Sequence, residues 1–508
     1  MQYDLIVIGS GPAGQKGAIA AAKLNKRVAI VERRSRAIGG VCLHSGTIPS
    51  KTMREAILHL TGYRQREVYG DQFRKKRNIR MEDLSLKLHQ VTDRELEVIQ
   101  DQLERNGVDV YAGNARFVGP HQVEVEGPAG QTVLRGENIL IACGTKPSRP
   151  DHIPFDGEHI FDTDEFLHLE EIPRSMIVVG GGVIGIEYAI MFATLGVDVT
   201  VVDGRERLLD FCDREIVDTL LYHARALGMT FRLGEEVTQI KRQTETNVMV
   251  ELKSGKRLIA ATALFSAGRV GDTEGLDLPA AGLRPDSRGR IACDENHQTE
   301  VSHIYGVGDI VGFPALASTA MEQGRRAACH AFGHEFKAFD HMPYGLFTIP
   351  EISMVGKSEQ ELTSECVPYE VGMARFGEIA RGQIVGDQTG MLKLLFHRDT
   401  LKLLGVHCIG DSATEIVHIG QTVMALGGTI EYLRDAVFNY PTMAECYKVA
   451  ALDGLNKHAF DQFEPRSQST SAELSKAIPQ VMPPVDVPPT EVVTLDANSA
   501  NADAALPT

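Results

Sequence analysis

The sequence lacks any cysteine pattern that would form a disulfide framework or a metal site. Its 8 cysteines are scattered, without CxxC pairs or metal-ligand spacing, which is typical of reduced thiols in the cytosol. No basic segment precedes the first apolar run, so we expect no secretory signal and a cytoplasmic protein. These absences argue against a disulfide-rich secreted protein and leave no predicted metal ligand.

Long apolar runs and an excess of basic charge are missing as well. The longest apolar stretch, residues 176–202, is interrupted by glycines and two acidic residues, which favours strand, turn, helix and strand over a membrane span. The 52 basic side chains are outnumbered by 68 acidic ones, and the formal net charge is -16. We therefore expect neither a nucleic acid nor a membrane as partner.

A glycine-rich turn lies between two apolar segments near the N-terminus. A buried strand is predicted before it, an alanine-rich helix after it, and then a second strand that ends at Glu32. The glycines permit a tight turn and close approach of a pyrophosphate, and Glu32 can accept a hydrogen bond from a ribose 2′-hydroxyl. This spacing predicts that an adenine dinucleotide binds here. The glycines are Gly9, Gly11 and Gly14.

A second unit of the same kind follows about 170 residues later. Its strand, glycine turn and helix are followed by a strand that ends at Asp203, a carboxylate that would bind the 2′-hydroxyl of NAD. Arg205 and Arg207 lie within reach of a 2′-phosphate, so the site would accept both NAD and NADP. Alternatively, both arginines are solvated surface residues. The glycines of this unit are Gly180, Gly182 and Gly185.

The segment 39–51 joins the first unit to a helix and carries reactive residue types. It resembles the redox-active segment of the flavoprotein pyridine nucleotide-disulfide oxidoreductases, in which two cysteines form a disulfide against the flavin ring. Cys42 is present here, but Thr47 stands at the second cysteine position, and its hydroxyl cannot cycle between thiol and disulfide. The resemblance also implies that Lys51 pairs with Glu187 beside the flavin.

The later motifs of this family are present with one further replacement. Residues 299–309 resemble the second FAD motif, in which Asp309 would hold the ribitol chain. Residues 438–445 match the family's His-Pro-Thr-x-x-Glu, with Glu445 retained and Tyr440 in place of the histidine. Tyrosine, with a reference pKa near ~10, cannot shuttle protons for dithiol exchange near neutrality. The resemblance further implies that the cofactors contact Gly144, Gly268, Arg269, Gly308, Asp309 and Ala317.

The resemblance spans residues 3–460 and implies an α/β fold. Two Rossmann-like domains would bind FAD and NAD(P), and a C-terminal α+β domain would form a homodimer or a larger homo-oligomer. After Phe463 the chain has no aromatic residue and no glycine, so we expect a disordered tail. The predicted limits are 1–150 and 276–343 for the FAD-binding domain, 151–275 for the NAD(P)-binding domain, 344–462 for the dimerisation domain and 463–508 for the tail.

With disulfide and histidine both replaced, the resemblance implies reversible hydride transfer between NADPH and NAD⁺ through FAD. NAD(H) and NADP(H) would then be the substrates, and Cys42, Thr47, Lys51, Glu187, Tyr440 and Glu445 would line the reaction centre. Two alternatives remain at this point. One is an NAD(P)H oxidase or a quinone or dye reductase of the same fold, and the other is a non-catalytic FAD-binding protein.

Overall fold

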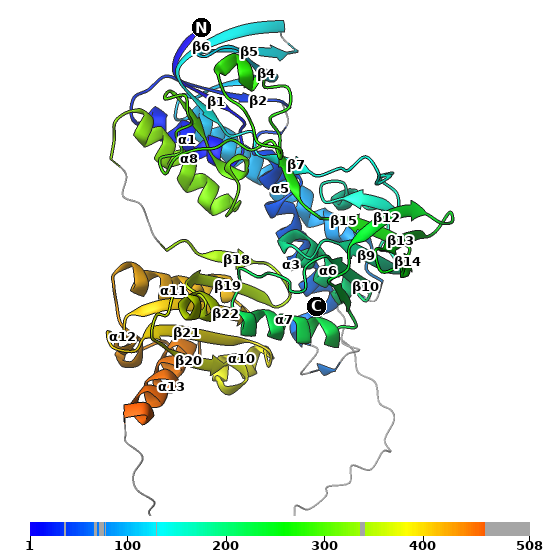
Figure 1. Cartoon of the computed structure of the whole chain (residues 1–508), viewed down its shortest axis with the longest axis vertical. Helices are drawn as coiled ribbons and strands as arrows, with labels where there is room; N and C mark the ends of the chain where they lie inside the picture. Colours follow the sequence, from blue (N-terminus) through cyan, green and yellow to red (C-terminus); the bar gives the residue numbers. More distant parts are fainter. Residues whose placement is uncertain are drawn as a thin grey trace, which may run out of the picture. The chain divides into compact units, whose positions relative to one another are not determined.

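A computed structural model of the chain shows where these segments lie (Figure 1). It describes residues 1–34, 37–65, 69–70, 76, 78–128, 130–335 and 341–462. The predicted disordered tail, 463–508, lies outside the described residues. Residues 1–458 form one compact unit. A strand of one of its sheets precedes the first glycine turn, a strand of a second sheet precedes the second glycine turn, and a third sheet forms the centre of the C-terminal domain.

The first sheet is built around β1 (Gln2–Ile8), an apolar and almost fully buried strand. It pairs in parallel with β2 (Val28–Glu32) and β6 (Gly130–Ile141), as expected for strands that helices cover. The chain returns to this sheet at β17 (Ile304–Gly306), and α1 (Pro12–Lys23) packs against α8 (Ala317–Ala331). The remaining strands of this sheet are β3 (Asp109–Ala112), β4 (Asn114–Gly119) and β5 (Gln122–Gly127).

The second sheet repeats this design around β9 (Ser175–Val179). The buried helix α6 (Val183–Leu195) follows the second glycine turn, and β10 (Asp198–Asp203) ends at the predicted acidic residue. Helix α7 (Arg214–Ala226) comes next. The other strands are β8 (Ile160–Asp162), β11 (Thr230–Leu233) and β15 (Thr262–Phe265) in this sheet, β12 (Val237–Arg242), β13 (Val248–Leu252) and β14 (Arg257–Ala260) in a three-stranded sheet, and the pair β7 (Thr145–Pro147) and β16 (Arg269–Gly271).

The C-terminal domain is an antiparallel sheet in the strand order β18-β19-β22-β21-β20, covered by helices. The edge strand β20 buries only Gly372 and Ala374, which alternate with partly exposed residues, whereas the inner strand β21 is buried over its first six residues. The strands are β18 (Tyr344–Leu346), β19 (Glu351–Gly356), β20 (Tyr369–Arg375), β21 (Met391–His397) and β22 (Leu403–Gly410). The helices are α9 (Glu359–Ser364), α10 (Ala380–Val385), α11 (Ala413–Ala425), α12 (Ile430–Asp435) and α13 (Glu445–Gln462).

One apolar cluster connects all three regions through α3 (Thr47–Thr61). It includes Ile57 of α3, Phe192 of α6 and Ile352 of β19, each with no more than 1% of its surface exposed. Burying a side chain of this size contributes about 1.5–3 kcal/mol, so the cluster fixes the start of α3 relative to α6. The predicted α/β class with two Rossmann-like units is confirmed. Among the described residues, the remaining α-helices are α2 (Gly40–His44) and α5 (Met81–Glu104).

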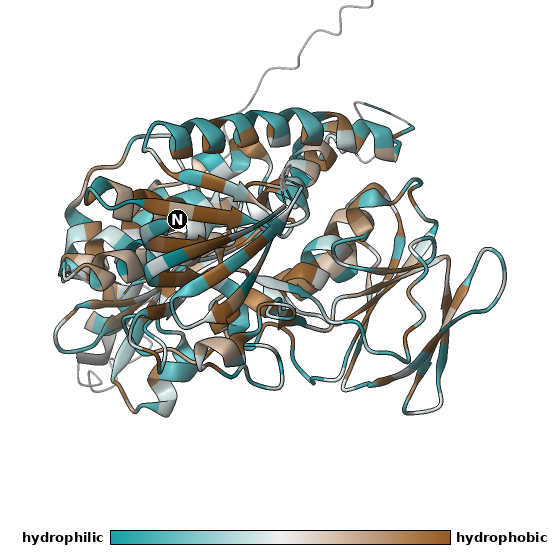
Figure 2. Cartoon of the chain, turned by 90° about the horizontal axis from the view of Figure 1, so that it is seen from above, coloured by the Kyte–Doolittle hydropathy of each residue, from teal (hydrophilic) through white to brown (hydrophobic). Residues whose placement is uncertain are grey.

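Hydropathy follows this layering (Figure 2). The central strands are mainly apolar, whereas the outer helices alternate between polar and apolar residues along their length. Among the described residues, no helix combines the length and the apolar character that crossing a membrane would require.

Candidate functional site

The segment 39–51 folds as α2 followed, after Ser45 and Gly46, by the first turns of α3. The thiol of Cys42 is partly buried, and the side chain of Thr47 and the backbone of Ile48 lie near enough to lower its pKa. Burial raises the pKa of Cys42 more than these two neighbours and the nearby Lys51 lower it. Thr47 therefore stands beside Cys42, as the sequence predicts for the second cysteine position, and the thiol stays protonated at neutral pH.

Lys51 and Glu187 form an ion pair between the two nucleotide-binding units. The Lys51 Nζ atom lies 2.5 Å from Glu187 Oε2, and the Glu187 side chain is only 5% exposed. The other carboxylate oxygen, Oε1, accepts a hydrogen bond of 2.8 Å from the backbone N–H of Phe347. The Lys51 ammonium also lies 5.1 Å from the centre of the Phe347 ring. This constellation joins α3, α6 and the C-terminal domain at one point.

The first glycine turn forms a cradle at the N-terminus of α1. A Cβ atom on Gly14 would lie 2.0 Å from the Gly9 carbonyl oxygen, so glycine is required for this close approach. A Cβ atom on Gly11 would meet no described atom within 4 Å, and no described side chain caps this helix end. Glu32 lies beside the turn and accepts a 2.5 Å hydrogen bond from the hydroxyl of Ser10. Free backbone N–H groups at a helix start are what a pyrophosphate binds.

The second glycine turn has the same close backbone contacts as the first, but its acidic residue, Asp203, is paired with an arginine. A Cβ atom on Gly185 would lie 2.1 Å from the Gly180 carbonyl oxygen, and one on Gly182 would meet no described atom within 4 Å. The Asp203 carboxylate accepts from Arg205 Nε at 2.9 Å and from Arg205 Nη2 at 2.8 Å. Burial raises the pKa of Asp203, but the hydrogen bonds from Arg205 and a backbone N–H outweigh it and lower the pKa.

This pairing bears on both interpretations of the arginines. Arg205 is an exposed surface residue, with its side chain 45% accessible, and its guanidinium also forms a bidentate pair with Asp203. Arg207 is exposed. The loop thus presents two exposed cations near the second glycine turn, of which Arg205 is paired with Asp203.

The second FAD motif is linked to the start of the NAD(P)-binding region through Thr145. The Thr145 hydroxyl donates to Asp309 at 3.3 Å and accepts from Arg269 Nε at 2.9 Å. Arg269 also reaches Asp164, at 2.9 Å. Gly144 and Gly268 both adopt positive φ, of 69° and 114°, at these chain crossings. The structure therefore brings four of the residues predicted to contact the cofactors close together, namely Gly144, Asp309, Gly268 and Arg269.

The predicted site residues Gly308 and Ala317 lie at the two ends of the turn that leads into α8. Gly308 adopts φ of 78° and donates its N–H to the buried side chain of Gln323 at 2.8 Å. Ala317 is the first residue of α8, whose preceding residue, Leu316, gives no side-chain cap among the described residues. The helix start is thereby left open to an acceptor.

Tyr440 and Glu445 do not join this constellation within one chain. No hydrogen bond or ion pair within the described ranges links either residue to Cys42, Thr47 or Lys51. The Tyr440 side chain is 72% exposed, whereas Oε2 of Glu445 is buried and has no hydrogen-bond partner among the described residues. Cys446, next to Glu445, is fully buried in the domain core, and burial raises its pKa.

Sequence reasoning missed several residues that hold the site together. Ser10 lies inside the first glycine turn, so its hydrogen bond to Glu32 had a local signal that could have been used. Phe347 and Gln323 act through a backbone N–H and a distant side chain, and the sequence carries no sign of either contact. The sequence also gives no sign of the role of Arg54. Its side chain donates to the Thr348 carbonyl at 2.9 Å and fixes α3 to the C-terminal domain.

Comparison with known proteins follows the same division of the chain. Residues 3–324 match the family model of pyridine nucleotide-disulphide oxidoreductases. Residues 342–451 match the model of the dimerisation domain of that family.

Curated relatives and solved structures cover nearly the whole described chain. A soluble pyridine nucleotide transhydrogenase of Mycobacterium bovis is 55% identical over 466 residues, which are 91% of this chain and 99% of the relative. A protein of the same name from Hahella chejuensis is 44% identical over 90% of this chain and 99% of its own length. The crystal structure of LpdA from Mycobacterium tuberculosis is 26% identical, with a TM-score of 0.82 over 88% of this chain and 99% of that one.

Proposed function

The chain belongs to the pyridine nucleotide-disulphide oxidoreductase family, and from this premise we propose that its reaction is NAD(P)⁺ transhydrogenation. NADPH and NAD⁺ are converted to NADP⁺ and NADH, and the reaction runs in both directions. Two relatives of 55% and 44% identity carry the name of this activity, and both are covered almost completely.

The replacement of the second redox cysteine is the observation that carries this proposal. A lone thiol cannot take up two electrons without a partner, and Thr47 occupies the place beside Cys42 where the partner would stand. Electrons from one nicotinamide nucleotide therefore have no dithiol through which to leave. The electron acceptor that the two nucleotide-binding units can still bind is a second nicotinamide nucleotide.

The residues of the first unit fit FAD. The open face of Gly11 and the uncapped start of α1, among the described residues, would receive the pyrophosphate. Glu32 would bind the adenosine ribose, and Asp309, held by Thr145, would bind the ribitol hydroxyls. FAD would supply the chemistry of accepting a hydride from one nucleotide and returning it to the other.

The chain's own residues position the nucleotides and hold the charge. Lys51 keeps a positive charge at a site from which α3, α6 and the C-terminal domain exclude much of the water. Glu187 fixes the ammonium from one side and is itself fixed by the N–H of Phe347, so the charge is preorganised. Asp203 and Arg205 together present a neutral pair to the ribose of the incoming nucleotide, whether or not it carries a 2′-phosphate.

The protein acts as a homodimer in this proposal. The match to a dimerisation domain supports it, and so does the strongly exposed apolar surface of α12 and the segment that follows it. Tyr440, Tyr432 and Val437 are 72%, 61% and 93% exposed in one chain. A partner subunit would cover them and place Tyr440 and Glu445 beside the partner's reaction centre.

Steady-state reduction of thio-NAD⁺ by NADPH tests the function, with oxygen and a quinone as competing acceptors. We expect turnover with thio-NAD⁺ that exceeds hydrogen peroxide formation and quinone reduction. Fast transfer to oxygen or quinone without thio-NAD⁺ reduction would identify an oxidase or a quinone reductase. Binding of FAD without any turnover would identify a non-catalytic flavin-binding protein.

A further inference from the structure

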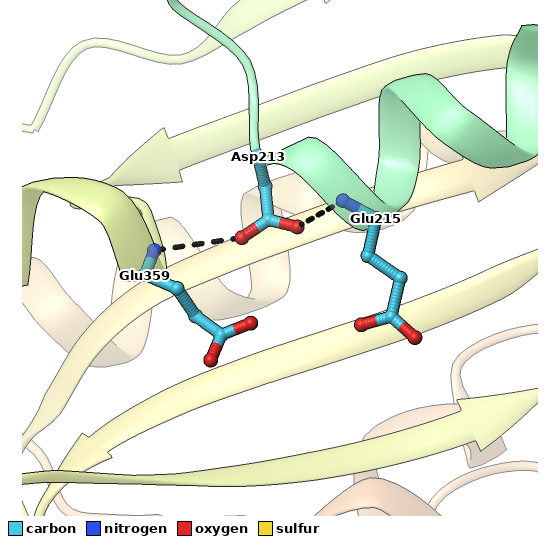
Figure 3. A group of neighbouring side chains, drawn as sticks. All are labelled: Asp213, Glu215 and Glu359. Carbon is cyan, nitrogen blue, oxygen red and sulfur yellow. Dashed lines mark hydrogen bonds between the residues drawn. The ribbon is translucent and has the colours of Figure 1, made fainter. Parts of the chain in front are cut away.

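Three carboxylates converge at the junction of α7 and α9 (Figure 3). They belong to Asp213, which caps α7, to Glu215 in its first turn, and to Glu359 at the start of α9. Their spacing is compatible with a metal ion, but the centre of the group is taken by Lys393 of β21. Its ammonium lies 3.0 Å from Asp213 and 3.1 Å from Glu215, and it is bonded to Glu359 as well.

Lys393 is therefore a fully buried cation that joins two domains. Its side chain is 0% exposed and that of Asp213 is 1% exposed. Burial lowers the pKa of Lys393, but the carboxylates more than offset this and hold the pKa above its usual value. A buried charge with three partners is costly to separate, so this contact holds α7 tightly to the C-terminal domain.

The residues around Asp213 strengthen the same attachment. The Phe211 ring packs against Tyr344 of β18 with 4.9 Å between ring centres. The Cys212 carbonyl accepts from Gln360 Nε2 at 3.2 Å, and Asp213 also accepts from the N–H of Glu359 at 3.4 Å. The segment 211–215, which we call the clamp segment, is thus held by side chains and backbone of the C-terminal domain.

The clamp segment lies only a few residues after the loop that carries Arg205. Between them, Leu208 is buried and packs onto the second glycine turn, where a Cβ on Gly181 would lie 2.2 Å from its Cδ2 atom. Leu209 is also buried and adopts φ of 49°, a left-handed conformation that a leucine keeps only when its surroundings enforce it. At the other end, Asp203 accepts a 2.6 Å hydrogen bond from the N–H of Gly181.

We propose that Lys393 is a positioning residue for the recognition of NADPH. By fixing the clamp segment, it stabilises the left-handed turn at Leu209. This turn then keeps the Arg205 loop in the position where its guanidinium can contact the 2′-phosphate of NADPH. The glycine turn anchors one end of this loop, and the C-terminal domain anchors the other. The selectivity between NADPH and NADH then depends on Lys393 of the C-terminal domain, although the Lys393 cluster itself contacts neither nucleotide.

This inference rests on the proposed role of Arg205, so its test uses binding rather than turnover. The affinities of the FAD-loaded dimer for 2′,5′-ADP and for 5′-ADP are measured by calorimetry in wild type, Lys393→Met, Arg205→Gln and the double variant. We expect Lys393→Met to weaken 2′,5′-ADP by roughly two- to thirtyfold and to leave 5′-ADP nearly unchanged. In the Arg205→Gln background the same change should have little further effect.

Two further variants keep the test decisive. Glu359→Gln removes one partner of Lys393 and leaves Asp213 paired, so it should show the same preference at smaller amplitude if Lys393→Met fails to fold. Lys457→Met removes an exposed lysine paired with Asp453 on α13 and should change neither affinity.

Equal weakening of both ligands, additive effects with Arg205→Gln, or no weakening at all would each overturn the positioning role. A wild-type protein that binds 2′,5′-ADP no more tightly than 5′-ADP would overturn it too. Failure of the proposed function is seen separately, as the absence of thio-NAD⁺ reduction by wild type.

Discussion

The two glycine turns share one backbone design but differ in the state of the acid beside them. In each turn, a Cβ on the third glycine would lie within 2.1 Å of a backbone oxygen, and a Cβ on the second glycine would meet no described atom within 4 Å. Glu32 accepts from the hydroxyl of Ser10, and no basic side chain of the described chain forms an ion pair with it. Asp203 is instead held by a bidentate Arg205.

This difference indicates how one fold serves a resident cofactor and an exchanging substrate. A free carboxylate binds a ribose diol strongly and repels a phosphate, which suits a cofactor without a 2′-phosphate. A carboxylate neutralised by arginine repels a 2′-phosphate less, and the guanidinium can itself bind it. We therefore expect the second unit to accept both nucleotides, as transhydrogenation requires.

The largest difference between the two nucleotide-binding units should appear when the third glycine of each turn is replaced by alanine. Gly14→Ala should abolish FAD binding, whereas Gly185→Ala should retain the flavin absorbance and lose reduction by NADPH. Overpacking of this kind costs about 1–3 kcal/mol, and here the contact is with backbone that cannot move aside. The ratio of flavin to protein absorbance and stopped-flow reduction measure the two effects.

Gly119→Ala is the matched control for these substitutions, because its Cβ would lie no closer than 3.9 Å to any neighbour. It should change neither flavin content nor reduction. Equal loss of flavin in Gly14→Ala and Gly185→Ala would mean that the two units are not separate sites.

Removing the ion pair that joins the units should have the next largest effect. Lys51→Ala should slow flavin reduction by NADPH roughly 100-fold, because a preorganised charge beside the reacting groups is lost and the buried Glu187 is left without its cation. Rapid-mixing absorbance gives the rate. Lys51→Arg keeps the charge and should recover part of it, and an unchanged rate in Lys51→Ala would refute the assignment.

Neutralising the arginines of the second unit should separate the two nucleotides. Replacing Arg205 and Arg207 by glutamine should raise the KM for NADPH roughly ten- to hundredfold, since hydrogen bonds to a charged group are lost and Asp203 becomes a free anion. The KM for NADH should change far less. Arg242→Gln, which breaks an exposed pair with Glu158, is the control. Parallel increases in both constants would contradict this role.

The smallest effect is expected at the remaining redox cysteine. Cys42→Ser should leave transhydrogenation largely intact, and anaerobic titration of wild type should bleach the flavin with one two-electron equivalent per FAD. Because burial raises the pKa of Cys42, its alkylation should accelerate only above the pH at which an ordinary thiol ionises. Uptake of four electrons would instead point to a second redox partner.

The sequence by itself determined the parts whose contacts are local. The glycine spacing specifies each turn because backbone clashes within a few residues decide it, and the neighbouring strands follow from their apolar runs. The motif positions of Cys42 and Thr47 already exclude the disulfide, because no packing can turn a hydroxyl into a thiol.

Tertiary structure decided everything that depends on segments far apart in the chain. Glu187 takes its second hydrogen bond from Phe347, 160 residues away, and Lys393 finds Asp213 at a separation of 180. No periodicity or spacing encodes such pairs, because they arise only when packed domains bring the two segments together. Asp203 and Arg205 are close in sequence, yet whether the exposed arginine pairs with that carboxylate depends on how the loop is held. That choice is made by the fold around the loop, from the Gly181 turn to the buried Leu208.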